Sequence, residues 1–139
     1  GTNDLAKELV LPQQTGRAGL LYALGSIILT AKAYNVITLD GVFNGISDEE
    51  GLRSEAEEGK NMGYDGKTLI HPNQIGLTNA VFSPTEKEIN LANKIIEAYE
   101  KAKEEKSGVT TVDGVLVEEL HVKQSLALIS KMKMIQSMS

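Results

Sequence analysis

The most informative stretch of this 139-residue chain is Gly63-Tyr64-Asp65-Gly66-Lys67-Thr68-Leu69-Ile70-His71-Pro72-Asn73-Gln74. Its first four residues, with two glycines and an aspartate, are typical of a loop. The residues that follow predict a short strand over 67–70, which ends at His71-Pro72. The stretch therefore predicts a short strand between two polar loops.

A helix and a strand are also predicted before this stretch. Apolar residues recur at steps of three and four over 15–35, which predicts an amphipathic helix. The inner face of this helix would carry Leu20, Leu24, Ile27 and Ala31, with Leu21 and Ile28 widening the same stripe. The β-branched run 36–39 then predicts a strand that stops at Asp40-Gly41. Helix and strand thus alternate, as in a βα fold.

A second helix joins the two predicted strands. Ser47 and Glu50 have the spacing of a capping box, in which each side chain bonds a backbone N–H of the other's turn. This pattern predicts a helix over about 48–62, with Leu52 and Ala56 facing inward. The alternation of helices and strands with tight loops predicts parallel βα units.

Three polar residues stand where apolar runs end, namely Asp4, Asp40 and His71, at intervals of 36 and 31 residues. This spacing is close to one βα unit, so their side chains should lie on one rim, at the carboxyl ends of parallel strands. Ligands bind at this rim in βα folds. For each residue taken alone, an ordinary polar turn remains the alternative.

The alternation of helices with short strands ends after residue 82. Ser83, Pro84 and Glu86 form a helix start, with Ser83 as N-cap, and predict a long helix to about Lys106. Ser107-Gly108 breaks this helix. A small hairpin over 109–117 and a last helix over about 119–135 are predicted to follow.

The composition excludes several classes of function. Fourteen Lys and Arg residues against nineteen Asp and Glu residues give a net charge of −5, which argues against nucleic acid and anionic membranes as partners. The chain has no Cys, so it has no disulfide, thiolate zinc site or cysteine nucleophile, and this composition suits the cytoplasm. The longest apolar run, 19–30, is too short to span a bilayer.

Several sequence motifs of this chain occur together in one known family. Residues 1–5 (GTNDL), 39–43 (LDGVF), 63–74 (GYDGKTLIHPNQ) and 82–84 (FSP) resemble, in this order, the citrate lyase beta subunit-like CoA-ester lyases. That family, which includes malyl-CoA and citramalyl-CoA lyases, belongs to the HpcH/HpaI aldolase superfamily. The resemblance covers nearly the whole chain.

The resemblance implies an α/β fold, the C-terminal part of a TIM (β/α)₈ barrel from about strand 6 to strand 8. Residues 1–82 would form these last βα units. Residues 83–139 would form a helical extension with a long helix, a small hairpin and a C-terminal lid helix. The chain opens at Gly1 without an initiator Met, so we expect a fragment that is stable only with the missing barrel half or with other copies.

The implied reaction is the cleavage of a C–C bond in a 3-hydroxyacyl-CoA of the malyl-CoA, citramalyl-CoA or citryl type, which gives an acyl-CoA and a 2-oxo acid. The implied cofactor is Mg²⁺ or Mn²⁺, with the CoA thioester as substrate. Two alternatives stay open. One is a 2-oxo-3-deoxy acid aldolase of the same superfamily, and the other is a non-catalytic fragment or paralogue with an assembly role.

The same resemblance implies roles for individual residues. Asp4 matches the metal-ligating Asp of the family, with a helix N-cap as the alternative. Its partner, a Glu on an earlier strand, is not in this chain, so half of the site would be missing. Lys67 is a candidate for binding a CoA phosphate, with an ordinary solvated lysine as the commoner alternative. His71 is a candidate for orienting substrate, and a hydrogen-bonded loop histidine is at least as good an interpretation.

The residues that end the hairpin resemble the lid of malyl-CoA and citramalyl-CoA lyases. There a final Asp reaches a neighbouring subunit's site as acid/base, and Glu118 occupies that position here. The resemblance therefore implies a homo-oligomer, a trimer or hexamer, with the lid exchanged between subunits. A further departure is Leu24, which stands where the family commonly has Arg, and Arg17 is a candidate to replace that cation.

Overall fold

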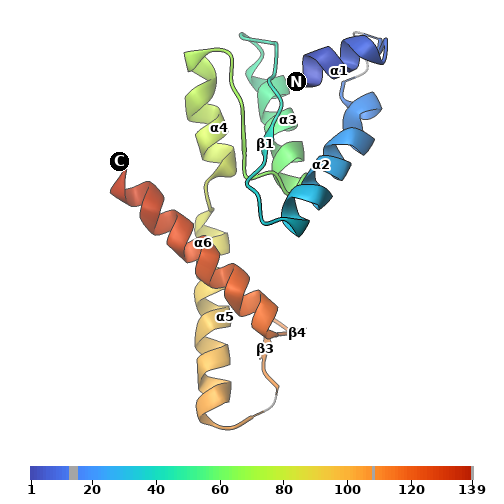
Figure 1. Ribbon diagram of the computed structural model, residues 1–139. Helices are drawn as coiled ribbons and strands as arrows, with labels where there is room; N and C mark the ends of the chain where they lie inside the picture. Colours follow the sequence, from blue (N-terminus) through green and yellow to red (C-terminus); the bar gives the residue numbers. More distant parts are fainter. Residues whose placement is uncertain (13–15, 108, 139) are drawn as a thin grey trace. The chain divides into compact units, whose positions relative to one another are not determined.

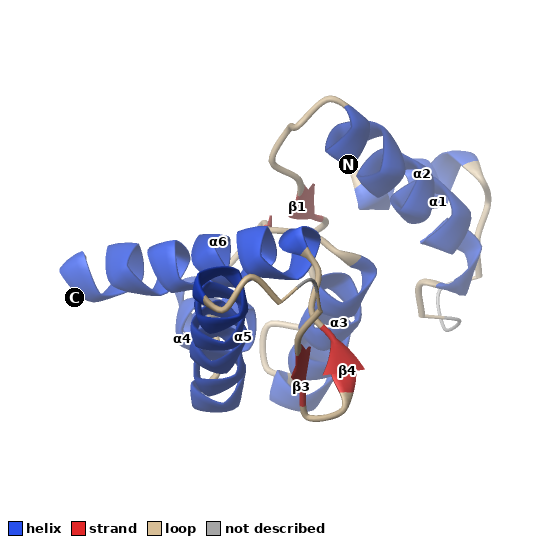
Figure 2. Cartoon of the chain, turned by 90° about the horizontal axis from the view of Figure 1, so that it is seen from below, coloured by secondary structure: helices blue, strands red, loops and turns tan. Residues whose placement is uncertain are grey.

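The computed structural model describes residues 1–12, 16–107 and 109–138. The chain forms two compact units, Gly1–Phe82 and Ser83–Ser139, which we treat separately. Figure 1 shows the elements in chain order. Helices make up most of both units, and the strands are short (Figure 2).

The first unit follows the predicted alternation of helix and strand. Its elements are α1 (Thr2–Glu8), the 3₁₀ turn η1 (Ala18–Leu20), α2 (Leu21–Ala33), β1 (Leu39–Asp40), α3 (Glu49–Met62), β2 (Gly66–Lys67), the 3₁₀ turn η2 (Pro72–Gln74) and α4 (Ile75–Phe82). The expected helix over 15–35 is thus shorter, and Thr15 lies outside the described residues.

The strands β1 and β2 pair in parallel, as the sequence predicts. Leu39 lies opposite Gly66, and Asp40 lies opposite Lys67. Both strands are shorter than predicted and cover two residues each. Backbone bonds extend the pairing on both sides, from Asp65 N–H to the Thr38 carbonyl (2.9 Å) and from Thr68 N–H to the Asp40 carbonyl (3.0 Å).

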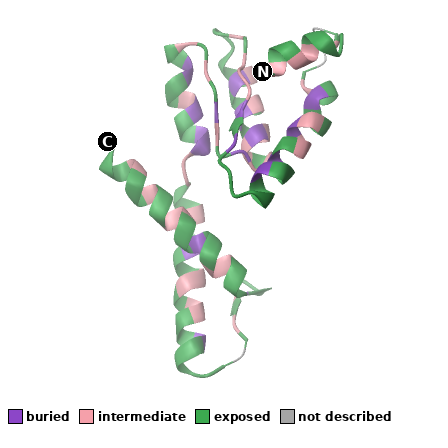
Figure 3. Cartoon of the chain, viewed as in Figure 1, coloured by how far each residue is buried: buried purple, intermediate pink, exposed green. Residues whose placement is uncertain are grey.

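The core of the first unit lies between α2, α3 and α4 (Figure 3). Its buried residues are Leu20, Leu24, Ile28, Ala56, Tyr64, Val81 and Phe82. The prediction that Ile27 faces inward is wrong, because Ile27 is half exposed and Ile28 takes the core position. The buried residues of η1 and α2 are Leu20, Leu24, Ile28 and Ala31, and this arrangement turns Ile27 away from the core.

Two predicted helix caps are shifted along the chain. At α3 the N-cap is Asp48, whose carboxylate accepts from Gly51 N–H at 2.9 Å, rather than Ser47. At α5 (Glu86–Glu104) the N-cap is Thr85 rather than Ser83. Thr85 and Glu88 complete a capping box, with bonds of 3.2 and 2.7 Å. In both places, nearby side chains could serve as the N-cap. The helix begins after the residue whose side chain accepts a hydrogen bond from a backbone N–H of the first turn.

The second unit contains α5, the strands β3 (Thr111–Val112) and β4 (Val115–Leu116), and α6 (Glu119–Ser137). The strands form the predicted antiparallel hairpin. Its two-residue turn has positive φ at Asp113 (50°) and Gly114 (80°), as tight hairpin turns require. The predicted helix break includes Gly108, which lies outside the described residues.

The second unit has a small core. The helices α5 and α6 pack on each other, and the buried residues are Ala92, Ala102, Val117 and Ser125. By contrast, Leu120, Leu126 and Met134 of α6 are more than half exposed. Much of the apolar surface of α6 therefore has no cover within this unit.

None of the helices in the described part of the chain is both long enough and apolar enough to cross a bilayer. This agrees with the sequence, in which charged residues interrupt the long helices α5 and α6.

Candidate functional site

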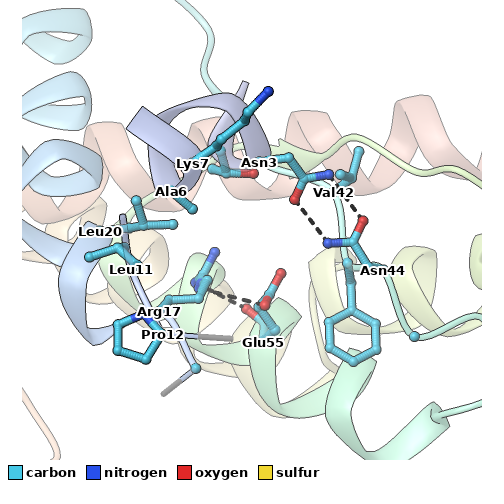
Figure 4. A pocket seen from close by; sticks show the side chains of 14 residues that line it. Asn3, Ala6, Lys7, Leu11, Pro12, Arg17, Leu20, Val42, Asn44 and Glu55 are labelled. Atoms are coloured by element: carbon cyan, nitrogen blue, oxygen red, sulfur yellow. Dashed lines mark hydrogen bonds and ion pairs between the residues drawn. The ribbon is translucent and has the colours of Figure 1, made fainter. Parts of the chain in front are cut away.

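A cavity of about 650 Å³ opens in the first unit between α1, η1 and the loop after β1. Figure 4 shows the side chains that line it. They combine amides, charged groups and apolar walls, and include Asn3, Lys7, Leu11, Arg17, Asn44 and Glu55. Such a mixed lining suits a polar ligand with an apolar portion.

Two residues that line this cavity, Arg17 and Glu55, also belong to a buried charged cluster around Asp40. The Asp40 side chain is fully buried. Its carboxylate accepts two bonds from Arg17 Nη1, at 2.7 and 2.6 Å, and one from its neighbour Gly41 N–H at 2.7 Å. Lys67 Nζ lies 3.3 Å from the same carboxylate. Asp40 therefore joins two cations that come from distant parts of the chain.

Two glutamates of α3 complete the cluster. Glu55 Oε1 lies 2.6 Å from Lys67 Nζ, and Glu58 Oε2 lies 2.6 Å from Arg17 Nη2. Burial alone would lower the pKa of Arg17, but the bonds to Asp40 and Glu58 outweigh it and raise that pKa above its ordinary value. The guanidinium is therefore always charged. Since buried charges are tolerated only when they are paired, each member depends on the others.

This cluster changes the interpretation of Asp40 and Lys67. The expectation placed Asp40 on an open rim, whereas it points inward, toward α3. The Lys67 side chain is fully buried, and its ammonium bonds Asp40, Glu55 and the Gly41 carbonyl. No N–H of this group is left to bind a CoA phosphate, so the structure corrects that expectation for Lys67.

Arg17 also departs from expectation. Leu24, which replaces an arginine of the family pattern, is a buried core residue. Arg17 does not take the place of that arginine, because its guanidinium is held by Asp40 and Glu58. Sequence reasoning missed Glu55 and Glu58. Their signal is that each stands directly before an inward position of α3, Glu55 before Ala56 and Glu58 before Gly59.

His71 is half-buried at the start of η2. Its Nδ1 accepts a hydrogen bond from Asn73 N–H at 3.2 Å, so the imidazole acts as the N-cap of this turn. This is the geometry of a hydrogen-bonded loop histidine. The second ring nitrogen, Nε2, is the atom left for a ligand.

Asp4 lies in the first turn of α1, and its side chain is 90% exposed. The residue at the N-cap of α1 is Gly1, so the alternative of Asp4 as N-cap is wrong. Its carboxylate lies 3.5 Å from the amino group of Gly1. In the part of the chain that the structure describes, no three His, Asp or Glu side chains gather as a metal site.

Glu118 lies in the second unit, directly before α6, and is exposed. Its backbone N–H donates to His121 Nδ1 at 2.9 Å, which helps to start the helix. Glu118 is therefore held at a helix start, at the end of the hairpin.

Residues 1–72 match the family model of the HpcH/HpaI aldolase/citrate lyase proteins. The chain belongs to this family. It is 51% identical over 130 residues to a (3S)-malyl-CoA thioesterase of Cereibacter sphaeroides, a match that covers 91% of this chain and 46% of the relative. It is also 34% identical to an L-malyl-CoA/beta-methylmalyl-CoA lyase of the same species, over 84% of this chain and 36% of the relative.

The chain is also similar to a citrate lyase subunit. A citrate lyase subunit beta of Leuconostoc mesenteroides is 44% identical over 71% of this chain and 33% of the relative. The chain thus spans less than half the length of these curated relatives. The resemblance inferred from the sequence motifs is confirmed.

The chain also shares its fold with solved structures. The CitE protein of Mycobacterium tuberculosis, in complex with magnesium, acetoacetate and coenzyme A, superposes with a TM-score of 0.68 at 24% identity, over 84% of this chain and 42% of that chain. A citrate lyase of Burkholderia xenovorans gives 0.70 at 22% identity, over 92% of this chain and 38% of that chain. This chain therefore shares its fold with part of each of these two proteins.

Proposed function

We propose that this chain is part of a CoA-ester lyase that cleaves a 3-hydroxyacyl-CoA of the malyl-CoA, citramalyl-CoA or citryl type into an acyl-CoA and a 2-oxo acid. The observation that carries the proposal is membership of the HpcH/HpaI family, together with two relatives, 51% and 34% identical, whose names contain malyl-CoA. Since the chain spans less than half of these relatives, the activity belongs to a larger protein or assembly.

The fold that goes with this proposal is the later part of a TIM barrel, about strands 6 to 8. The β1 region supports it, because Thr38 and Asp40 are buried whereas Ile37 and Leu39 are 78% and 58% exposed. One face of the sheet is thus covered by helices and the other carries exposed apolar side chains. Further strands and their side chains would cover that face.

The reaction needs a base and a way to stabilise an enolate. A base takes the proton of the 3-hydroxyl group, the adjacent C–C bond breaks, and its electron pair forms the enolate of the acyl-CoA, which is then protonated on carbon. We propose Glu118 as a group that moves one of these protons. Its carboxylate is exposed at the end of the hairpin, where a substrate can reach it.

We propose Asp4 as one ligand of Mg²⁺ or Mn²⁺. An exposed carboxylate oxygen is a ligand that these ions prefer, and Mg²⁺ often takes only one or two from the protein. The described residues supply no cluster of three such ligands, and water and substrate oxygens are the other ligands that Mg²⁺ commonly keeps. When bound, such an ion stabilises negative charge on the substrate oxygens.

The test uses the full-length protein that contains this chain. Malyl-CoA and citramalyl-CoA are supplied, and release of the 2-oxo acid is followed as its phenylhydrazone. We expect release that stops with EDTA, returns with Mg²⁺ and falls at least about a hundredfold in Asp4→Ala. If neither thioester yields a 2-oxo acid, the proposal is overturned.

Hydrolysis of the same thioester is a second candidate. Four relatives that are 50–51% identical over 91% of this chain are named (3S)-malyl-CoA thioesterase. In that reaction water attacks the thioester carbonyl, the C–S bond breaks, and malate and CoA thiol leave. Free thiol without 2-oxo acid in the same assay would identify this reaction.

The assembly is also a proposal. We propose a homo-oligomer, a trimer or hexamer, in which the hairpin and α6 of one subunit reach the site of another. The exposed apolar residues of α6 support it, because a small core leaves them without cover. The cytoplasmic location stays a prediction.

A further inference from the structure

Two asparagines from distant parts of the chain pair at the cavity. Asn3, in the first turn of α1, donates to Asn44 Oδ1 at 3.0 Å, and Asn44 donates back to Asn3 Oδ1 at 2.9 Å. Figure 4 shows the two bonds side by side. Each amide thus uses one donor and its acceptor on the other, which fixes their relative orientation.

The loop that carries Asn44 is held from its other side by Gln74. This side chain is 1% exposed, and its Nε2 donates to the Phe43 carbonyl at 3.0 Å. Its Oε1 accepts from Ile70 N–H at 3.1 Å. Phe43 and Asn44 are neighbours in the sequence. Gln74 and Asn3 therefore form hydrogen bonds with adjacent residues of one loop.

Close packing leaves this loop little freedom. A Cβ at Gly41 would collide with the side chain of Thr2 in α1. A Cβ at Gly45 would lie 2.8 Å from the Phe43 ring, and one at Gly51 would lie 2.6 Å from it. The start of α1 and the Phe43 ring therefore rest directly on glycine backbone.

We propose that Asn3, Asn44 and Gln74 form a positioning device that holds the loop 41–45 against the first turn of α1. This device sets where Asp4, the residue after Asn3, lies relative to the loop wall of the cavity. Asp4 itself is exposed, so the backbone of α1 determines its place. The inference rests on the proposed function, in which Asp4 belongs to the reacting site.

The Asn3–Asn44 pair affects the position of the loop 41–45 rather than the free energy of unfolding. Asn3 and Asn44 are both exposed, so water replaces their bonds when either side chain is removed. Gln74 is buried and cannot be replaced in this way. The pair is therefore the part of the device that can be tested without unfolding the protein.

The test is a double-mutant cycle in the full-length protein with Asn3→Ala, Asn44→Ala and both together. We expect kcat for the thioester to fall about tenfold in each variant, with KM changed less than about twofold. The double variant should be no worse than either single variant, because both remove the same pair. Asn79→Ala, which removes an exposed amide on α4, should leave kcat unchanged.

Hydrogen exchange provides a second measurement that does not depend on activity. The backbone amides of 42–45 should exchange at least about threefold faster in all three variants, while the melting temperature stays within about 2 °C. Unchanged exchange, or unchanged kcat in an active protein, overturns the positioning device. If the unmodified protein releases neither 2-oxo acid nor CoA thiol, the proposed function fails, and the exchange data still decide whether the pair holds the loop.

Discussion

At the scale of single residues, the charged cluster around Asp40 is the main feature that the sequence does not reveal. Arg17, Glu55, Glu58 and Lys67 lie up to 50 residues apart along the chain and meet only through the fold. The sequence predicts the polar end of β1 at Asp40, but it predicts the side chain on an open rim, whereas the side chain is buried. The direction of this side chain depends on which face of β1 the helices cover.

Removal of one cation from this cluster should be costly. Lys67→Met keeps most of the length of the side chain but removes the ammonium group, so that Asp40 and Glu55 have less positive charge beside them in a buried place. We expect a loss of about 3–5 kcal/mol in the free energy of unfolding, measured by urea denaturation of the full-length protein. The matched control is Lys32→Met, since Lys32 pairs with Asp65 on the surface and should cost less than about 1 kcal/mol. Equal effects of the two variants would contradict the buried cluster.

The lowered pKa of Asp65 predicts that the folded state loses stability at acid pH. Burial would raise its pKa, but bonds from Thr38 N–H and Lys32 outweigh this and lower the pKa below the ordinary value of 3.8. The ionised Asp65 therefore stabilises the fold above this ordinary value, and the stabilisation is lost as pH falls through the lowered pKa.

The variant Asp65→Asn tests this dependence. The difference in unfolding free energy between the unmodified protein and the variant should be larger at about pH 5 than at about pH 2, because the stabilisation by ionised Asp65 decreases as pH falls toward and through the lowered pKa. A difference that stays constant over this range would show that the charge of Asp65 contributes nothing.

At the scale of elements, the sequence predicts the order of helices and strands over 36–70 and from residue 83 onward, and the two-residue turn at Asp113-Gly114. It does not predict α4, Ile75–Phe82. The exact helix starts were harder to predict, because candidate caps stand next to one another, as Ser47 and Asp48 do. The competition is settled by which backbone N–H each side chain can reach. The lengths of the strands depend on pairing, which the local sequence does not encode.

The capping box of α5 gives an element-scale prediction. Thr85→Ala removes the hydroxyl that accepts from Glu88 N–H and should cost about 1 kcal/mol of unfolding free energy. Thr85→Ser keeps the hydroxyl and should cost less than half as much. Thermal unfolding of both variants measures the difference. If the two variants melt at the same temperature, Thr85 is not the cap.

Gln74 ties the loop after β1 to the loop after β2. Gln74→Met keeps its volume but leaves the Phe43 carbonyl and the Ile70 N–H without this partner. We expect a loss of about 2 kcal/mol or more in unfolding free energy. A loss below about 0.5 kcal/mol would contradict the role that the structure gives to this side chain.

At the scale of the whole molecule, the first unit carries exposed apolar residues on β1, and the chain spans less than half of its relatives. If the rest of a barrel covers that face, Leu39→Asp should destabilise the full-length protein by several kcal/mol. Leu29→Asp, at a more exposed position on α2, should cost much less. Chemical denaturation of both variants compares them, and equal losses would argue against a covered face.

The central claim is that this chain belongs to a lyase that breaks a C–C bond of a CoA thioester. The most direct measurement is the ratio of 2-oxo acid to free CoA thiol released from malyl-CoA by the full-length protein. The account predicts one 2-oxo acid for each malyl-CoA consumed, with almost no free thiol. Free thiol in equal amount to the malyl-CoA consumed, with no 2-oxo acid, would contradict it.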